Sequence, residues 1–119
     1  MIKKMSESEE KLADIIWEKE PVSSKDIVTL CEENMGWKKS TTYTILKRLE
    51  EKGIFKNEKS TVYSVMSKNE YLSQQSCKFI DNAFGGSLPA FISAFTKKRK
   101  LSKKDIMSIK DMIDNYEEE

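Results

Sequence analysis

Apolar residues recur at the three- and four-residue spacing of a helix in three segments near the start of the chain. This spacing predicts helices over 7–19, from Ser23 to about Asn34, and over about 39–52. Ser6 and Ser23 are each followed three residues later by an acidic residue, a pairing that satisfies the free backbone donors of a first helical turn. The first part of the chain is therefore expected to be helical.

Two short extended segments follow the third predicted helix. Residues 54–56 and 62–65 flank the polar stretch 57–60, which predicts a β-hairpin whose turn is longer than a tight two-residue connection. Val22, between the first two helices, predicts one further short strand. Three helices followed by a hairpin, in this order, form a winged helix.

Helical spacing returns after Met66. The pattern predicts a helix over about 68–83, a short apolar helix from Ser87 through Phe95, and a last helix that begins after Ser102. Two glycines separate the first two of these helices, and a basic run separates the last two. The expected fold class is therefore mainly α with a small β-hairpin.

The chain is expected to divide into two parts. Residues 1–66 predict an N-terminal winged helix-turn-helix, and residues 67–119 predict a helical C-terminal dimerisation segment. A chain of 119 residues has room for one compact domain with a short appendage, and it buries a limited share of its surface. Pairing with a second copy would therefore stabilise it.

Composition narrows the class of protein. No apolar stretch approaches the roughly 20 residues needed to cross a bilayer, so we expect no membrane insertion. The two cysteines, Cys31 and Cys77, lie far apart, which favours reduced thiols and a cytoplasmic location. Histidine is absent, and neither a glycine-rich phosphate loop nor a nucleophile–base pair occurs. We expect no enzyme, no metal site and no cofactor.

The net charge of +1 conceals an uneven distribution. Residues 1–34 carry five lysines and nine acids, whereas residues 35–60 carry seven basic residues and three acids. A nearly neutral protein with one basic segment is suited to local contact with phosphate groups rather than to general polyanion binding.

The third predicted helix has two different sides when its residues are placed at intervals of about 100°. The side expected to face the core holds Thr42, Ile45, Leu46 and Leu49. The opposite side holds hydroxyl and basic side chains, which can approach bases and neutralise phosphates. With two lysines of the hairpin they form the predicted DNA contacts: Lys38, Lys39, Ser40, Thr41, Tyr43, Thr44, Lys47, Arg48, Lys56 and Lys59.

Many amphipathic helices that touch no nucleic acid also carry lysine and threonine on their outer side. The alternative function is therefore a winged helix used only for protein–protein contact, without sequence-specific DNA binding. Salt dependence separates the two, because each phosphate contact releases counterions and makes DNA binding weaken steeply as salt rises.

Several of these residues match a known pattern in order and spacing. The pattern W-x-x-x-T-x-x-T-x-x-x-R-L-x-x-K-G is met by Trp37, Thr41, Thr44, Arg48-Leu49 and Lys52-Gly53, and Ile16-Trp17, Tyr63, Phe79-Ile80 and Gly85-Gly86 fit as well. Over nearly its whole length the chain resembles the BlaI/MecI/CopY repressors. The resemblance implies a winged-helix homodimer that binds a palindromic operator in double-stranded DNA and represses antibiotic-resistance or copper-homeostasis genes.

The chain departs from that family at two places in the pattern. Lys38-Lys39-Ser40 stands where many relatives have a serine or threonine cap followed by Pro-Lys, and Tyr43 stands where relatives often have arginine or glutamine. These differences bear on base preference. The paired C-terminal cysteines of the copper-responsive branch are missing, so copper sensing is not expected.

The C-terminal half carries more apolar side chains than a monomer of this size can easily bury. We expect them to form an isologous dimer interface, and the alternative is that they pack on the N-terminal domain. The predicted interface residues are Phe79, Ile80, Phe84, Leu88, Phe91, Ile92, Phe95, Ile109 and Ile113.

The resemblance also implies a mode of release. Relatives of the β-lactam-responsive branch are inactivated by a protease, commonly at an Asn-Phe bond, and alignment places Ala94-Phe95 at that location. A cut there would detach the last helix, weaken pairing and release DNA. The adjacent basic run 97–100 has two interpretations, a guide for a protease or a solubilising loop.

Overall fold

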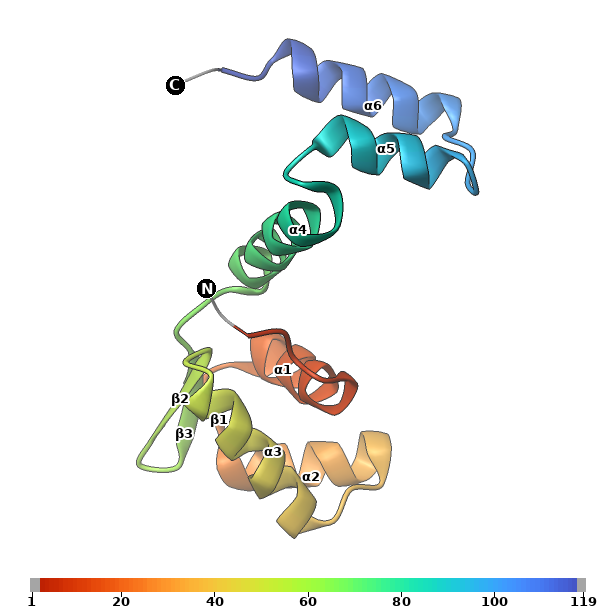
Figure 1. Ribbon diagram of the computed structural model, residues 1–119. Coiled ribbons are helices and arrows are strands. Elements are labelled where there is room, and N and C mark those ends of the chain that lie inside the picture. The colour runs from red at the N-terminus through yellow and green to blue at the C-terminus, as the bar shows by residue number, and fades with distance from the viewer. Residues whose placement is uncertain (1–2, 118–119) are drawn as a thin grey trace. The chain divides into compact units, whose positions relative to one another are not determined.

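The computed structural model describes residues 3–117, and the elements follow the order predicted for a winged helix with a helical C-terminal part (Figure 1). Along the chain they are α1 (Glu7–Lys19), β1 (Val22–Ser23), α2 (Ser24–Met35), α3 (Lys39–Glu51), β2 (Phe55–Glu58), β3 (Thr61–Ser64), α4 (Lys68–Phe84), α5 (Leu88–Thr96) and α6 (Lys103–Asp114). The predicted fold class is confirmed. Among the described residues, no helix is both long enough and apolar enough to span a bilayer.

The helix boundaries follow from capping residues. Ser6 accepts a hydrogen bond from the backbone N–H of Glu9, whose side chain in turn accepts from the Ser6 N–H, so the predicted capping box starts α1. Ser23 caps α2 through the N–H of Asp26 at 3.0 Å. Gly36 ends α2 with a φ of 67°, in the left-handed region that glycine enters at little cost.

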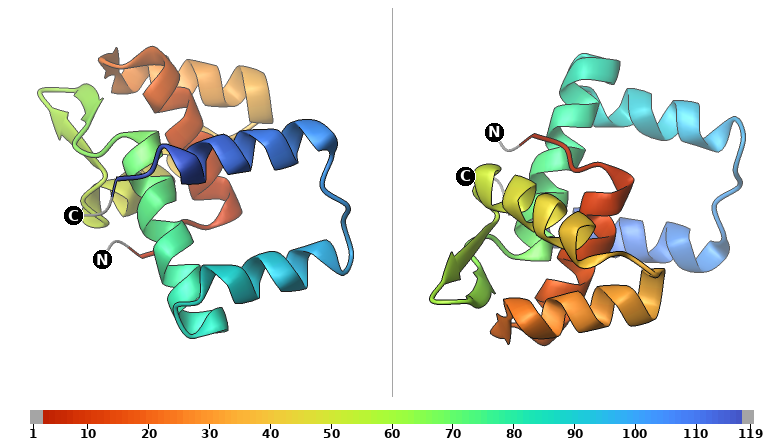
Figure 2. Two further views of the ribbon diagram at one scale, coloured as in Figure 1. Left: turned by 90° about the horizontal axis from the view of Figure 1, so that it is seen from above. Right: turned by 90° about the horizontal axis from the view of Figure 1, so that it is seen from below.

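The wing is a three-stranded antiparallel sheet with strand order β1-β3-β2. Figure 2 shows β2 and β3 as a hairpin that projects from helices α1 to α3. The prediction of a long turn over 57–60 is wrong. Glu58 pairs with Thr61, so the turn consists only of Lys59 and Ser60, with φ values of 51° and 65°. Two adjacent left-handed residues match the twist of a tight hairpin, although neither of them is glycine or asparagine.

The hydrophobic core lies entirely in the first part of the chain. Leu12 and Ile16 of α1, Ile27 of α2 and Leu49 of α3 are completely buried, and Phe55 of the wing is almost completely buried. Removing these apolar stripes from water stabilises the fold by about 1.5–3 kcal/mol per side chain. The core thereby fixes which side of α3 remains outside.

The chain forms two compact units, which divide within α4 between Lys78 and Phe79. The start of α4 belongs to the first unit because the Tyr71 hydroxyl accepts a hydrogen bond of 2.8 Å from the N–H of Met5. The Tyr71 ring also lies 6.1 Å from that of Trp17. The first compact unit thus extends past residue 66, the boundary that the sequence pattern predicts. The pattern gives no sign that Tyr71 is buried.

The second unit contains the end of α4 with α5 and α6. Ser87 caps α5 by accepting from the N–H of Ala90 at 3.1 Å, and Ser102 caps α6 by accepting from the N–H of Asp105 at 3.0 Å. Four phenylalanine rings form a chain of contacts with centroids 5.6–6.2 Å apart, at Phe79, Phe84, Phe91 and Phe95. No residue of this unit is buried within residues 79–117.

Candidate nucleic-acid interface

Helix α3 has one buried and one exposed side, as its periodicity predicts. Thr42, Ile45, Leu46 and Leu49 are buried in the core. The predicted DNA contacts of this region are all exposed, and so are the two predicted wing lysines. They are Lys38, Lys39, Ser40, Thr41, Tyr43, Thr44, Lys47 and Arg48, with Lys56 and Lys59 on the wing. We refer to the eight residues of this set from Lys38 to Arg48 as the outer face of α3.

The N-terminus of α3 is left open. Lys38 occupies the capping position and makes no side-chain hydrogen bond to the helix, and the first turn contains no acidic residue. The first backbone N–H groups of a helix have no acceptor within the helix, and the helix dipole is positive at this end. The departure from the family's serine or threonine cap therefore leaves donors and positive charge available for a phosphate group.

The hydroxyl groups on the outer face of α3 differ in what they can offer. Thr44 donates its hydroxyl hydrogen to the backbone carbonyl of Ser40 at 2.9 Å, so its remaining capacity is a methyl group and an acceptor. Within residues 3–117, the hydroxyls of Ser40 and Thr41 have no hydrogen-bond partner in the protein. Ser40 and Thr41 thus have hydroxyls free to donate to a base edge or a phosphate.

The Tyr43 side chain lies next to Lys39 on this helix. Its ring is 38% exposed, and the Lys39 ammonium lies over it at 5.9 Å from the centroid. Such an exposed cation–π contact contributes about 0.5–1 kcal/mol, enough to bias both side chains toward one arrangement. Tyr43 and Lys39 therefore act as a pair on the outer face of α3.

A shallow hollow of about 260 Å³ lies along the same helix. It is lined by Ser40, Thr41, Thr44, Ile45 and Arg48. Guanidinium and hydroxyl donors around one concave surface are the groups used for phosphate and base-edge contacts.

The wing carries Lys56 and Lys59 and is fastened at two points. The Ser24 N–H donates to the carbonyl of Ser60 in the hairpin turn at 2.9 Å. The Glu20 carboxylate accepts from both the N–H and the hydroxyl of Ser64, at 2.8 and 2.7 Å. Sequence reasoning missed Glu20, since its role arises only when the chain after α1 meets β3.

One acidic group of the wing is engaged within the hairpin. The Tyr63 hydroxyl donates to Glu58 at 2.9 Å. This hydrogen bond to the carboxylate, together with slight burial, raises the pKa of Tyr63 above its ordinary value. Tyr63 fits the pattern of the family that the chain resembles. Its hydroxyl hydrogen-bonds the Glu58 carboxylate, the acidic group beside Lys56 and Lys59 on the wing.

The C-terminal end of α3 is tied to the start of the chain. The Lys52 ammonium pairs with the nearly buried Glu9 carboxylate and donates to the Lys4 carbonyl at 3.1 Å. Burial alone would raise the pKa of Glu9, but the hydrogen bonds from Lys52 and Ser6 outweigh it and hold this pKa below its ordinary value. The pair links the end of α3 to the first turn of α1.

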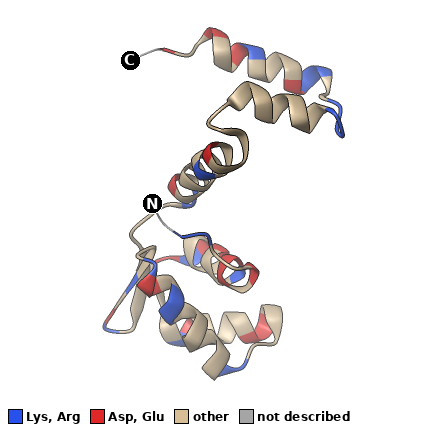
Figure 3. Cartoon of the chain, in the orientation of Figure 1, with Lys and Arg blue, Asp and Glu red and all other residues tan. Residues whose placement is uncertain are grey.

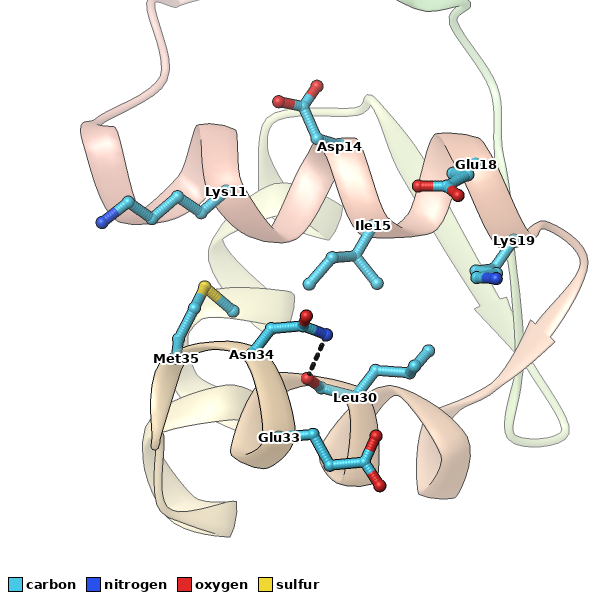
Figure 4. A pocket seen from close by; sticks show the side chains of 9 residues that line it. All are labelled: Lys11, Asp14, Ile15, Glu18, Lys19, Leu30, Glu33, Asn34 and Met35. Carbon is cyan, nitrogen blue, oxygen red and sulfur yellow. Dashed lines mark hydrogen bonds between the residues drawn. The ribbon is translucent and has the colours of Figure 1, made fainter.

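A second hollow, of about 580 Å³, lies between α1 and α2 (Figure 4). Its lining includes the carboxylates of Asp14, Glu18 and Glu33, and the Asn34 side chain there already donates to the Leu30 carbonyl at 2.8 Å. Lys11 and Lys19 also line this hollow, so three carboxylates stand against two ammonium groups there. The hollow therefore suits phosphate less well than the outer face of α3, which carries no acid. Figure 3 shows basic positions on α3 and at the tip of the wing.

Three helices, an antiparallel wing and a basic, hydroxyl-bearing third helix define a winged-helix protein. Among the described residues, no cluster of His, Cys, Asp and Glu could hold a metal ion. Comparison with known proteins identifies the family. A family model described as penicillinase repressor matches residues 5–115, so the chain belongs to the penicillinase repressor family.

Individual relatives agree with this assignment. The chain is 28% identical over 115 residues to the penicillinase repressor of Staphylococcus aureus, covering 93% of this chain and 91% of that protein. It is 24% identical over 113 residues to the methicillin resistance regulatory protein MecI of Mammaliicoccus sciuri, covering 92% of each. The predicted family is confirmed, and the chain is a transcriptional repressor of this type rather than an enzyme.

Proposed function

We propose that this repressor binds a palindromic operator in double-stranded DNA as a homodimer, in the cytoplasm, with α3 entering the major groove. The observation that carries the proposal is the division of α3 into a buried apolar side and a continuous exposed side of basic and hydroxyl residues. An open helix N-terminus next to Lys38 and Lys39 supports entry by that end. The wing lysines, Lys56 and Lys59, would contact the adjacent phosphates.

The homodimer is supported by the large apolar side chains that the second unit leaves exposed to solvent. Phe79 is 54% exposed, Leu88 56% and Ile113 66%, although large apolar side chains of a stable monomer are mostly buried. All nine predicted interface residues are exposed or half-buried: Phe79, Ile80, Phe84, Leu88, Phe91, Ile92, Phe95, Ile109 and Ile113. Met107 and Met112 of α6, 66% and 65% exposed, are further uncovered apolar residues of this unit, and the sequence pattern did not include them.

A palindromic operator fits a symmetric dimer, because two identical recognition helices related by a two-fold axis meet two identical half-sites. Linking two weak binding units in this way raises the apparent affinity by about 10²–10⁴. The dimer is thus the state in which this small repressor would hold DNA.

Relief of repression would follow from cleavage at the bond between Ala94 and Phe95. Both residues are exposed in the last turns of α5, immediately before the loop that leads to α6. A cut there would separate α6 from the rest of the second unit, remove part of the apolar surface and lower the affinity of pairing. The protease would be a separate partner.

The proposal is tested by selecting bound duplexes from a random pool and measuring their affinity against salt concentration. We expect enrichment of an inverted repeat, and an affinity for it that falls steeply as salt rises. Recovery of no enriched sequence, with no duplex bound at low ionic strength, would instead favour the alternative of a winged helix used for protein–protein contact.

A further inference from the structure

Basic residues form a dense group in the connection between α5 and α6. Six of the eight residues from 97 to 104 are lysine or arginine. All six are exposed, and within residues 3–117 none of them pairs with a carboxylate. We refer to Lys97, Lys98, Arg99, Lys100, Lys103 and Lys104 as the basic connection. Figure 3 shows it as a concentrated basic stretch in the second unit.

The basic connection is locally unfavourable for the protein by itself. Lys103 and Lys104 occupy the first two positions of α6, where the positive end of the helix dipole disfavours cations. Neighbouring lysines also repel one another, and the intervening residues supply no acid. An external anion would relieve both effects, because Asp105, the one acidic residue in the first turn of α6, stands beside six basic residues.

One member of the basic connection is held in place. The Arg99 guanidinium lies 5.4 Å from the centroid of the Phe95 ring, and the N–H of Arg99 donates to the Phe95 carbonyl at 3.1 Å. The backbone of 97–99 continues from α5 by hydrogen bonds to Ala94 and Phe95. This part of the basic connection is therefore ordered on the end of α5 rather than detached from it.

The chemistry of the basic connection fits the phosphate backbone of a nucleic acid duplex. Duplex DNA presents one negative charge about every 1.7 Å along its axis, which suits closely spaced cations. An anionic lipid surface would also need free apolar side chains beside the charges. Leu101, between Lys97 and Lys104, is half-buried, and the exposed Phe95 beside Arg99 belongs to the predicted dimer interface. We propose that the basic connection is a second DNA-binding surface, which contacts phosphates without reading sequence.

This inference rests on the proposed function only in taking duplex DNA as the ligand. The basic residues of the chain are concentrated in two segments, 35–60 in the first unit and 97–104 in the second. The first contains the outer face of α3, which would read sequence, and the second contains no residue of that face. The two contributions can therefore be separated by mutation.

The test compares two full-length triple variants that change the charge equally. The first combines K97Q, K98Q and K100Q, and the matched control combines K11Q, K19Q and K110Q, all at exposed positions outside both proposed DNA surfaces. The measured quantity is the slope of log affinity against log salt for a mixed-sequence duplex. We expect the first variant to flatten the slope by about 0.9 for each phosphate that it no longer neutralises, and the control to leave it unchanged.

Two results would overturn the inference. The first is a slope for K97Q/K98Q/K100Q equal to those of the wild type and the control. The second is an unchanged slope together with loss of binding to phosphatidylglycerol vesicles, which would assign the basic connection to a membrane surface. A flattened slope for the mixed-sequence duplex in a protein that enriches no operator would uphold the inference and contradict the proposed function.

Discussion

Lys47 lies on the outer face of α3, exposed and one turn after Tyr43. If it contacts a phosphate, K47A should weaken binding to all duplexes alike and flatten the salt slope by about one unit per protomer. Affinity measured over a salt series for an operator and for an unrelated duplex checks this. K11A removes an exposed lysine from α1 and serves as the control. An unchanged slope would remove Lys47 from the interface.

Tyr43 is expected to act on sequence preference rather than on total affinity. Its ring is held beside Lys39, and it occupies a position where related repressors often have arginine or glutamine. Y43A should therefore change which bases are preferred, by about 1–3 kcal/mol of discrimination at one position of each half-site. Selection of duplexes by the variant and the wild type provides the comparison. An equal loss of affinity on every duplex would contradict this role.

The Glu9–Lys52 pair predicts a pH dependence of stability. Because the folded protein holds the pKa of Glu9 below its ordinary value of 4.5, the pair stabilises the fold above that pH. The stabilisation is lost as pH falls through the lowered pKa. E9Q should reduce the free energy of unfolding at neutral pH by about 2 kcal/mol and weaken this acid dependence.

Urea denaturation of E9Q and the wild type at a series of pH values measures both effects. K52Q, which removes the other partner, should reproduce the loss at neutral pH, because it leaves the nearly buried carboxylate without its cation. The same acid dependence in E9Q as in the wild type would show that other carboxylates govern acid unfolding.

At the scale of elements, the wing turn stores backbone strain. Ser60 has a φ of 65°, a left-handed conformation that a residue with a Cβ adopts at a cost of roughly 1–2 kcal/mol. S60G should therefore increase the free energy of unfolding by about 0.5–1 kcal/mol, because glycine enters this region without that cost. Chemical denaturation measures the change, and T61G, in the adjoining strand, should have the opposite sign. A less stable S60G would refute the strain.

The elements differ in how far they could be predicted. Serine caps and glycine ends are local signals, so the predicted limits of α1, α2 and α3 lie within a residue or two of the observed ones. The wing turn was misjudged because Lys59 and Ser60 carry no local sign of left-handed backbone. What fixes the turn is pairing with distant segments, including the hydrogen bond from Ser24 to Ser60.

In the candidate site, too, features set by local pattern could be predicted, and contacts between distant segments could not. The exposed side of α3 followed from its periodicity, because the core residues between Thr42 and Leu49 determine which side remains outside. The Glu20 contact with Ser64 and the Tyr63 contact with Glu58 join residues whose relation depends on strand register. No pattern along the chain contains that register.

At the scale of the whole molecule, the second unit is predicted to hold the dimer together. A chain truncated after Phe95 lacks α6 and with it Ile109 and Ile113. It should therefore sediment as a monomer, whereas the intact chain is expected to sediment as a dimer. The first unit should keep its fold in the truncated chain, because its core ends at Tyr71. A stable dimer after truncation would refute the assigned interface.

In the proposed homodimer, the lack of any buried side chain among residues 79–117 would link the folding of that unit to the amount of protein present. A helical unit that gains a dry interior only from a second copy obeys mass action, so dilution and heating act on it in the same direction. A cell with few copies would occupy the operator weakly for this reason alone, and each added copy would raise occupancy more than proportionally.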